Sequence, residues 1–137
     1  MGKWSEMSRK CYAALGIAIS GTGLLLSACA VPLVEGRATL LPSGDQAISI
    51  EASNFQFAPN VIRARAGVPI QIRVVNDSGF DHNLTVELAG QAALSQDIPA
   101  GGQAEVKFTP PGAGRFPIYC NKTGHRAFGM EGVIVAE

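Results

Sequence analysis

Alternation of apolar and polar side chains is the feature that most restricts the fold of this sequence. Ile70, Ile72 and Val74 alternate with polar neighbours, and the same period of two recurs several times after residue 45. Successive side chains of a strand point to opposite faces, so this period indicates strands with one buried face. The other alternating or short apolar stretches are 48–51, 84–88, 104–108, 116–118 and 133–135.

Turn residues separate these stretches, at 66–67, 77–79, 100–102 and 110–112. Several short strands at this spacing predict an all-β fold, a two-sheet antiparallel sandwich over residues 46–137. The 16 Gly and 8 Pro of the chain also suit many turns better than long helices. Residues 90–96 are the one stretch after the leader that is compatible with a turn or two of helix.

The beginning of the chain has the layout of a secretory signal. Lys3, Arg9 and Lys10 precede an apolar run that closes with Leu26-Ser27-Ala28-Cys29. A charged start, a short apolar stretch and small residues before a cleavage site are typical of exported chains. The last four residues resemble a bacterial lipobox, so residues 1–28 are predicted to be a lipoprotein signal peptide and Cys29 the lipidated first residue. The alternative is an uncleaved membrane anchor with an incidental cysteine, although the apolar stretch is short for a span.

Both interpretations place the domain outside the cytoplasm, anchored to a bacterial membrane on its periplasmic side or at the outer cell surface. Residues 29–45 have no clear period and include Pro32, Pro42 and Gly44. They are therefore expected to form a lipidated N-terminus and a flexible linker ahead of the domain at 46–137.

The charge of the chain argues against a nucleic-acid partner. Loss of Lys3, Arg9 and Lys10 reduces the 11 Lys+Arg to 8, and loss of Glu6 reduces the 11 Asp+Glu to 10. This faintly acidic balance provides neither the basic face that nucleic acid requires nor a polybasic segment for anionic lipid. The length of 137 residues leaves room for one domain.

Only one cysteine remains in the exported domain, because Cys11 leaves with the signal and Cys29 is used by the lipid. Cys120 therefore has no intramolecular disulfide partner, and a metal would protect this thiol in an oxidising compartment. Cys120 has the same parity as Phe116 and Ile118, and His82 has the same parity as Leu84. Alternation thus predicts that His82 and Cys120 both point into the interior.

Four side chains of the domain have the chemistry of one metal site: His82, Cys120, His125 and Met130. The last three form a C-x4-H-x4-M array between the last two predicted strands. Two imidazoles, one thiolate and a long axial thioether suit a single copper ion that alternates between Cu(I) and Cu(II). Zinc is the rival metal, but structural zinc sites use thiolate, imidazole or carboxylate rather than thioether. Each residue alone is more often a core or surface residue, and only the joint pattern indicates a site.

The stretch from Phe55 to Glu137 resembles the cupredoxins, the type 1 or blue copper family. The resemblance is carried by Phe57-x-Pro59, the Ala66-Gly67 turn, His82-Asn83 and the closing ligand loop, whose spacing is closest to auracyanin- and rusticyanin-like members. It implies a Greek-key sandwich with copper at one end and electron transport as the function. It also implies that Asn83 steadies the ligand loops and donates a hydrogen bond towards the thiolate, whereas the alternative is an ordinary turn asparagine.

The ligand loop also departs from the auracyanin pattern, because polar residues at 121–123 replace apolar residues and proline. In the family the exposed histidine lies in an apolar patch through which electrons pass. Phe128 is expected to contribute to this patch, with Lys122 and Arg126 on its rim. We therefore hypothesise that the two cations bias docking towards an acidic partner surface, and a solvated loop without such a role is the alternative.

The leading functional prediction is a membrane-tethered electron carrier whose partners are cytochromes or membrane respiratory or photosynthetic complexes. The alternative is a copper-holding or copper-delivery lipoprotein, or else a part of a larger assembly. Delivery proteins use Met- and His-rich surfaces, and this domain has one Met and no surplus His. An enzyme acting on a small-molecule substrate is not expected, since four ligands leave copper no open position.

Overall fold

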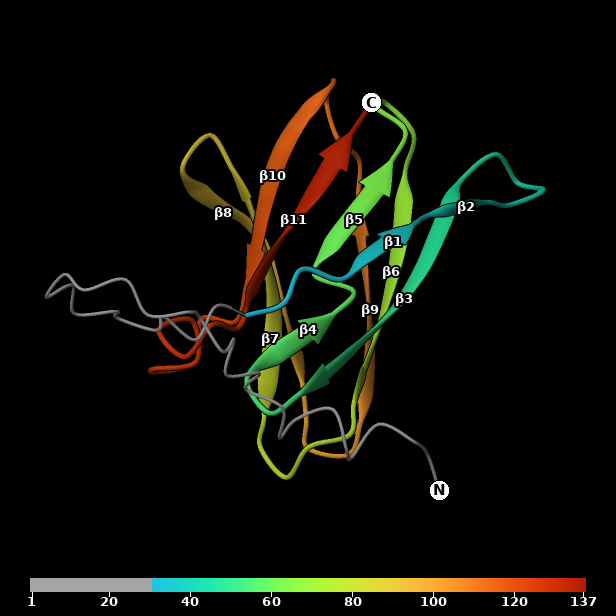
Figure 1. The fold of residues 1–137 in the computed structure, drawn as a ribbon. Helices are drawn as coiled ribbons and strands as arrows, with labels where there is room; N and C mark the ends of the chain where they lie inside the picture. Colours follow the sequence, from blue (N-terminus) through green and yellow to red (C-terminus); the bar gives the residue numbers. More distant parts are fainter. Residues whose placement is uncertain (1–30) are drawn as a thin grey trace, which may run out of the picture. The chain divides into compact units, whose positions relative to one another are not determined.

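The strands of the domain form two packed sheets in a computed structural model that describes residues 31–137 (Figure 1). The predicted signal peptide and Cys29 lie outside these residues. The part from Pro32 to Glu137 is one compact unit. Within the described residues no helix is both long and apolar enough to cross a bilayer. The strands are β1 (Glu35–Arg37), β2 (Thr39–Leu40), β3 (Gln46–Ser53), β4 (Gln56–Ala58), β5 (Val61–Ala64), β6 (Ile70–Asn76), β7 (His82–Leu88), β8 (Gln91–Ile98), β9 (Gln103–Phe108), β10 (Gly114–Tyr119) and β11 (Glu131–Ala136).

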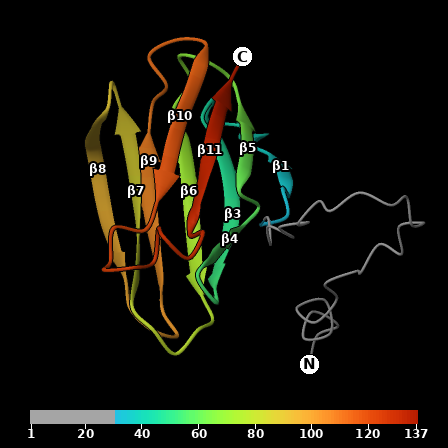
Figure 2. The same cartoon turned by 60° about the vertical axis from the view of Figure 1, so that its left-hand side comes forward.

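The first sheet has the order β1-β5-β11-β10-β7-β8, and the second has the order β2-β3-β6-β9 with β4 paired to β3. Figure 2 shows β10 and β11 in front of strands of the second sheet. The chain passes repeatedly between the sheets, from β5 to β6, from β6 to β7, from β8 to β9 and from β9 to β10. The predicted all-β sandwich of Greek-key type is therefore confirmed.

The sheets are mixed, whereas alternation had predicted antiparallel sheets. β3 pairs with β6 in parallel, and β5 pairs in parallel with both β1 and β11. Parallel neighbours need a crossover between them, and here the chain makes that crossover through the opposite sheet. A period of two reports which side chains are buried, but it contains no information about the direction of the neighbouring strand. The direction was therefore not readable from the pattern.

The prediction of a flexible linker over 29–45 is wrong from Pro32 onward. β1 pairs with β5 and β2 pairs with β3, so the folded domain begins well before residue 46. The Asn60 side chain fixes the entry of the chain, since it accepts from Val34 N at 2.8 Å and donates to Pro32 O at 3.0 Å. A Cβ on Gly36 would lie 2.5 Å from Pro59 Cγ, so the strand packs closely against the domain. These strands are too short for alternation to be visible.

Residues 90–96 form no helical turn, because Gly90 lies in a hairpin turn and residues 91–96 belong to β8. β7 and β8 are joined by a tight hairpin in which Ala89 and Gly90 have φ values of 51° and 77°. Positive φ at both central residues is the geometry that matches the twist of paired strands. β8 is the edge of the first sheet and is mostly exposed, so it lacks the apolar alternation that marked the other strands.

The core lies between the sheets and contains most of the residues that alternation had placed inside. Leu88 is an exception because it is exposed, and alternation had not placed Phe57, Ile62 and Ile98 in the core. Ile72, Val74, Leu84, Val86 and Ile118 are fully buried. Burial of an aliphatic side chain of this size stabilises the fold by about 1.5–3 kcal/mol. His82 begins β7 and Cys120 directly follows β10, so the same core positions two polar side chains at one end of the sandwich.

Candidate metal centre

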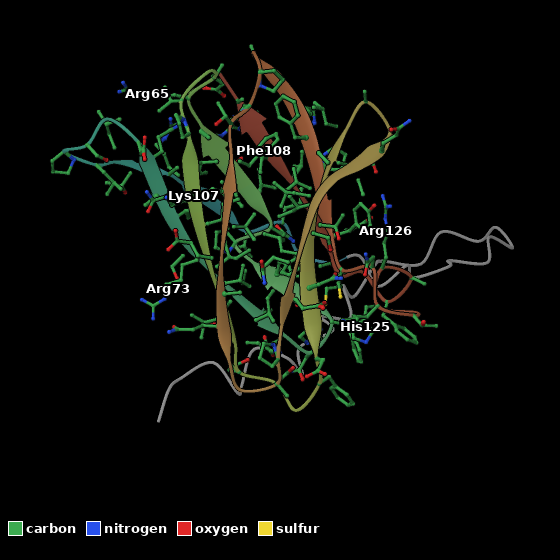
Figure 3. The ribbon with its side chains drawn as sticks, turned by 180° about the vertical axis from the view of Figure 1, so that it is seen from behind. Arg65, Arg73, Lys107, Phe108, His125 and Arg126 are labelled. Atoms are coloured by element: carbon green, nitrogen blue, oxygen red, sulfur yellow. The ribbon has the colours of Figure 1, made fainter. Side chains whose placement is uncertain are left out.

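The predicted ligands come from three strand ends and the loop that joins two of them. His82 is the first residue of β7, Cys120 follows β10, and Met130 precedes β11. His125 lies in the loop from 120 to 130, which Figure 3 shows at one side of the domain. Because β7 and β11 flank β10 in one sheet, these ends are neighbours.

Three donor atoms of these residues converge. His82 Nδ1 lies 3.1 Å from His125 Nδ1, and Cys120 Sγ lies 3.4 Å from the same His125 nitrogen. One donor atom from each residue lies within 4.8 Å of those from the other two. The predicted inward orientation of His82 and Cys120 is confirmed, since both side chains are fully buried.

Met130 is held next to these residues by its backbone. Its N–H donates to His125 O at 3.1 Å, and its carbonyl accepts from Cys120 N at 3.0 Å. The side chain is fully buried, as expected of a thioether turned away from solvent. The structure thus gathers all four predicted ligand residues at one end of the sandwich.

Short-range hydrogen bonds shape the loop that carries His125. Its N–H donates to Lys122 O at 3.0 Å, and Phe128 N donates to Gly124 O at 3.1 Å. Gly124 and Gly129 have φ values of 82° and 100°, a region in which a side chain would be strained. These two glycines allow the loop to reverse direction twice, so that His125 returns towards Cys120.

These donor atoms fit a metal that binds both sulfur and imidazole nitrogen. The two Nδ1 atoms and the sulfur face one another without an intervening carboxylate. Burial lowers the pKa of His82, and electrostatic repulsion from the neighbouring His125 lowers it further, while Asp81 acts in the opposite direction. The neutral imidazole that results is the form that binds metals. The arrangement can therefore hold a metal through two nitrogens and one sulfur.

Asn83 connects the start of β7 to the ligand loop. Its backbone N–H donates to Cys120 Sγ at 3.4 Å, and its Oδ1 accepts from Asn121 N at 2.8 Å. Its amide nitrogen donates to Asn121 Oδ1 as well. The hydrogen bond to sulfur thus comes from the backbone, while the side chain fixes the loop immediately after Cys120.

Phe55 packs against His125 and against two further phenylalanines from separate loops. The Phe55 ring meets the His125 ring edge-on at 4.8 Å, and it contacts Phe80 at 5.6 Å and Phe128 at 5.4 Å between centroids. Phe80 and Phe128 are 57% and 69% exposed, so they form an apolar surface over the site. Sequence reasoning had found Phe128 but had missed Phe55 and Phe80, since no local pattern relates three loops.

The two cations of the loop have acidic partners. Lys122 Nζ lies 2.8 Å from Asp97 Oδ1, and this carboxylate raises the pKa of Lys122. Arg126 Nε lies 3.1 Å from Glu131 Oε2, and its guanidinium lies 4.1 Å from the centre of the Tyr119 ring. Both cations belong to the loop that carries His125 and Phe128, and their charge is partly compensated locally.

The fold is a β-sandwich, and two imidazoles and one thiol converge at one end of it. Together they identify the chain as a small metal-binding sandwich protein. The model of the cupredoxin-like domain family matches residues 17–136 of this chain. The chain belongs to that family. No curated protein sequence matches it significantly.

Solved structures with the same fold include copper proteins. Reduced auracyanin from Roseiflexus castenholzii is 18% identical with a TM-score of 0.58, covering 66% of this chain and 96% of that one. Reduced rusticyanin is 21% identical with a TM-score of 0.53, covering 66% and 79%. The metal-binding domain of the Cu(I)-exporting P-type ATPase CopA of Streptococcus pneumoniae D39 is 20% identical with a TM-score of 0.58, covering 78% and 99%. At these identities the likeness establishes the fold.

Proposed function

We propose that this chain is a mononuclear type 1 copper protein that carries single electrons between redox partners. The observation that carries the proposal is that one donor atom each of His82, Cys120 and His125 lies within 4.8 Å of the other two. Two imidazoles, one thiolate and an axial thioether are the donor set of electron-transfer copper sites. Met130, buried and bonded through its backbone to Cys120 and His125, supplies the thioether.

Copper would supply a one-electron couple between Cu(I) and Cu(II). The protein's part is to keep the donors in one arrangement for both oxidation states. Cys120 and Met130 favour the reduced ion, whereas the imidazoles of His82 and His125 keep the oxidised ion acceptable. The ends of β7, β10 and β11 hold these side chains in a shared sheet, so little has to move when an electron is exchanged.

The electron route that we propose runs through the surface around His125. Phe80 and Phe128 are exposed and pack on Phe55, which contacts His125. Partner proteins dock on apolar surfaces of this kind. Lys122 and Arg126 lie on its rim, where they would favour a partner with acidic groups at its edge. Because Asp97 and Glu131 compensate part of their charge, we expect a moderate contribution from them.

We further propose that Cys29 is lipidated and tethers the domain to a membrane. The folded unit begins at Pro32, so only residues 30 and 31 would separate the lipid from the domain. The three Cα–Cα steps from Cys29 to Pro32 span at most about 11 Å. Val34 bonds to Asn60, and Asn60 O accepts from Val133 N at the start of β11, close to Met130. The tether would therefore keep the end of the domain that bears the metal close to the bilayer.

A copper-delivery role is the second candidate, favoured by the likeness to the metal-binding domain of a Cu(I) exporter. Delivery requires ligands that a partner reaches easily. His82, Cys120 and Met130 are fully buried, which favours retention of the metal and electron exchange instead.

The two roles are separated by one set of measurements on residues 30–137, which contain the whole compact unit. Loading with Cu(II) should give an intense visible charge-transfer band, and Cys120→Ser should abolish it. Electron exchange with a c-type cytochrome is then followed by stopped flow. Reversible reduction with rapid exchange supports the carrier, tight Cu(I) uptake without reversible redox supports delivery, and absence of copper binding refutes both.

A further inference from the structure

Asn76, the last residue of β6, is a buried amide whose orientation is determined by its neighbours. Its Nδ2 lies 2.8 Å from Phe80 O, 3.1 Å from Ile98 O and 3.1 Å from Pro99 O. Carbonyl oxygens only accept hydrogen bonds, so the group facing them has to be the NH₂. The Oδ1 of Asn76 therefore faces the opposite way.

On that opposite side lies Ser78. Its backbone N–H donates to Asn76 Oδ1 at 3.0 Å, and its Oγ lies 2.7 Å from the same oxygen. Oδ1 carries no hydrogen, so the Ser78 hydroxyl is the donor in the second contact. The other oxygen near this hydroxyl, Phe80 O at 3.2 Å, is also only an acceptor. The single hydroxyl hydrogen of Ser78 is thus directed to an oxygen.

The third contact of Ser78 is with His82. Ser78 Oγ lies 2.9 Å from His82 Nε2. Since the hydroxyl hydrogen is already used, the hydrogen in this contact has to come from Nε2. A neutral imidazole carries one ring hydrogen, so Nδ1 keeps its lone pair. That lone pair points towards the site, where His125 Nδ1 lies 3.1 Å away.

We propose that Asn76 and Ser78 are positioning residues that select the Nε2–H tautomer of His82 before any metal arrives. The role of the free Nδ1 as a metal ligand rests on the proposed function. The tautomer itself follows from the hydrogen bonds alone. Outer partners of metal-binding histidines fix ring orientation and tautomer in this way. Here the partner is a serine hydroxyl, itself oriented by a buried asparagine.

The loop that carries Ser78 is anchored at both ends. Asn76 N donates to Gly102 O at 2.9 Å, and Asp81 Oδ1 accepts from Ala100 N at 2.9 Å. A fixed loop keeps the hydroxyl in place when the ring of His82 rotates or tilts. The other tautomer would require the hydroxyl to turn towards Nε2 and leave Asn76 Oδ1 with a single donor.

The first test uses residues 30–137 without metal, so its result does not depend on copper binding. Long-range nitrogen–proton NMR spectra at a pH of about 8, above the usual histidine pKa of about 6.5, report which ring nitrogen carries hydrogen. We expect His82 with Nε2 protonated. A wild-type His82 with hydrogen on Nδ1 overturns the proposal, even when the protein binds copper well. Ser78→Ala should give a mixture of tautomers, and Ser78→Thr should restore the wild-type spectrum.

The second test measures binding of Cu(I) by competition with a chromophoric chelator. Loss of an outer hydrogen bond to a ligating histidine typically weakens metal binding about 10–100-fold, which is the result we expect for Ser78→Ala. The matched control is Ser95→Ala. It removes a serine hydroxyl on β8 whose side-chain partner is Thr85 Oγ1 at 2.9 Å and not a ligand residue. Equal affinities for Ser78→Ala and Ser95→Ala overturn the proposal.

The two tests keep this proposal separate from the proposed function. A wild-type protein that binds no copper refutes the function, whereas the NMR spectrum still decides the tautomer. The reduction potential is a third measurement. Because the imidazoles favour Cu(II), weakening His82 in Ser78→Ala should raise the potential, and Ser78→Thr should return it towards the wild-type value.

Discussion

Asn83 and Cys120 meet where β7 begins and β10 ends, with the backbone N–H of Asn83 donating to the Cys120 sulfur at 3.4 Å. The side chain of Asn83 makes two further hydrogen bonds to Asn121, which directly follows Cys120 in the chain. One asparagine therefore joins the strand that bears His82 to the loop that bears His125. Hydrogen bonds to a thiolate and to the residues around it tune a metal site without contacting the metal.

The Asn83–Asn121 pair should contribute both stability and loop order. We expect Asn83→Ala to lower the free energy of unfolding of the metal-free protein by about 1–3 kcal/mol, because Asn121 N is left without its partner. Chemical denaturation measures this change. A double-mutant cycle with Asn121→Ala should show strong coupling, and additive effects would indicate that the two side chains act independently.

Glu51 and Asp77 should make stability depend on pH. The hydrogen bond to Asp77 is the main cause that raises the pKa of Glu51, followed by burial and by the charge of Asp77. A carboxyl whose pKa is higher in the folded state stabilises the fold at low pH, and this stabilisation is lost as the pH rises through that pKa. At neutral pH the two ionised groups therefore repel each other.

We accordingly expect Glu51→Gln to stabilise the protein at neutral pH and to have no effect below the ordinary Glu pKa of 4.5. The gain should be about 0.5 kcal/mol or less, because exposed charge pairs are screened by solvent. Thermal unfolding at several pH values measures it. Asp77→Asn should give a similar gain and the double variant no more, whereas a gain that persists in acid would contradict the assignment.

The cations beside the apolar surface should affect association with an acidic redox partner. We expect the pair Lys122→Glu and Arg126→Glu to slow partner reduction about tenfold at low salt and much less at high salt, since steering by exposed charge is screened within about 10 Å at 0.1 M salt. Stopped-flow rates over a range of salt concentrations test this.

The matched control for this experiment is the pair Arg65→Glu and Lys107→Glu. Both are exposed, and Figure 3 shows them on the opposite side of the domain from His125. The control changes net charge equally but leaves the rim intact. Equal slowing by the two pairs would mean that overall charge is responsible and not docking at the His125 surface. Asp97→Asn, which removes the acidic partner of Lys122, should accelerate the reaction.

Lipidation of Cys29 should determine where the protein is found. We expect the full chain to partition with membranes and Cys29→Ser to appear in the soluble extracytoplasmic fraction or to retain an uncleaved leader, because several acyl chains hold a protein at a bilayer almost permanently. Fractionation and mass spectrometry of the N-terminal peptide measure this. Cys11→Ser is the matched control and should leave the distribution unchanged. A membrane-bound Cys29→Ser variant with a cleaved leader would contradict the proposal.

The alternation of side chains determined which residues are buried. It placed Ile72, Val74 and Leu84 in the core, and the same parity turned His82 and Cys120 inward. These properties depend on the geometry of a single strand, in which successive side chains alternate whatever the neighbours are. The spacing from Cys120 to Met130 likewise defined the loop that carries His125.

Only the tertiary structure decided which strands became neighbours. The parallel pairing of β3 with β6, the pairing of β1 with β5, and the packing of Phe55 on His125 all join residues far apart in the chain. The contact of Ser78 with His82 spans only four residues, yet it depends on Asn76 being oriented by carbonyls of a different loop. Such contacts follow from how sheets pack and loops close, and a local sequence pattern does not encode that relation.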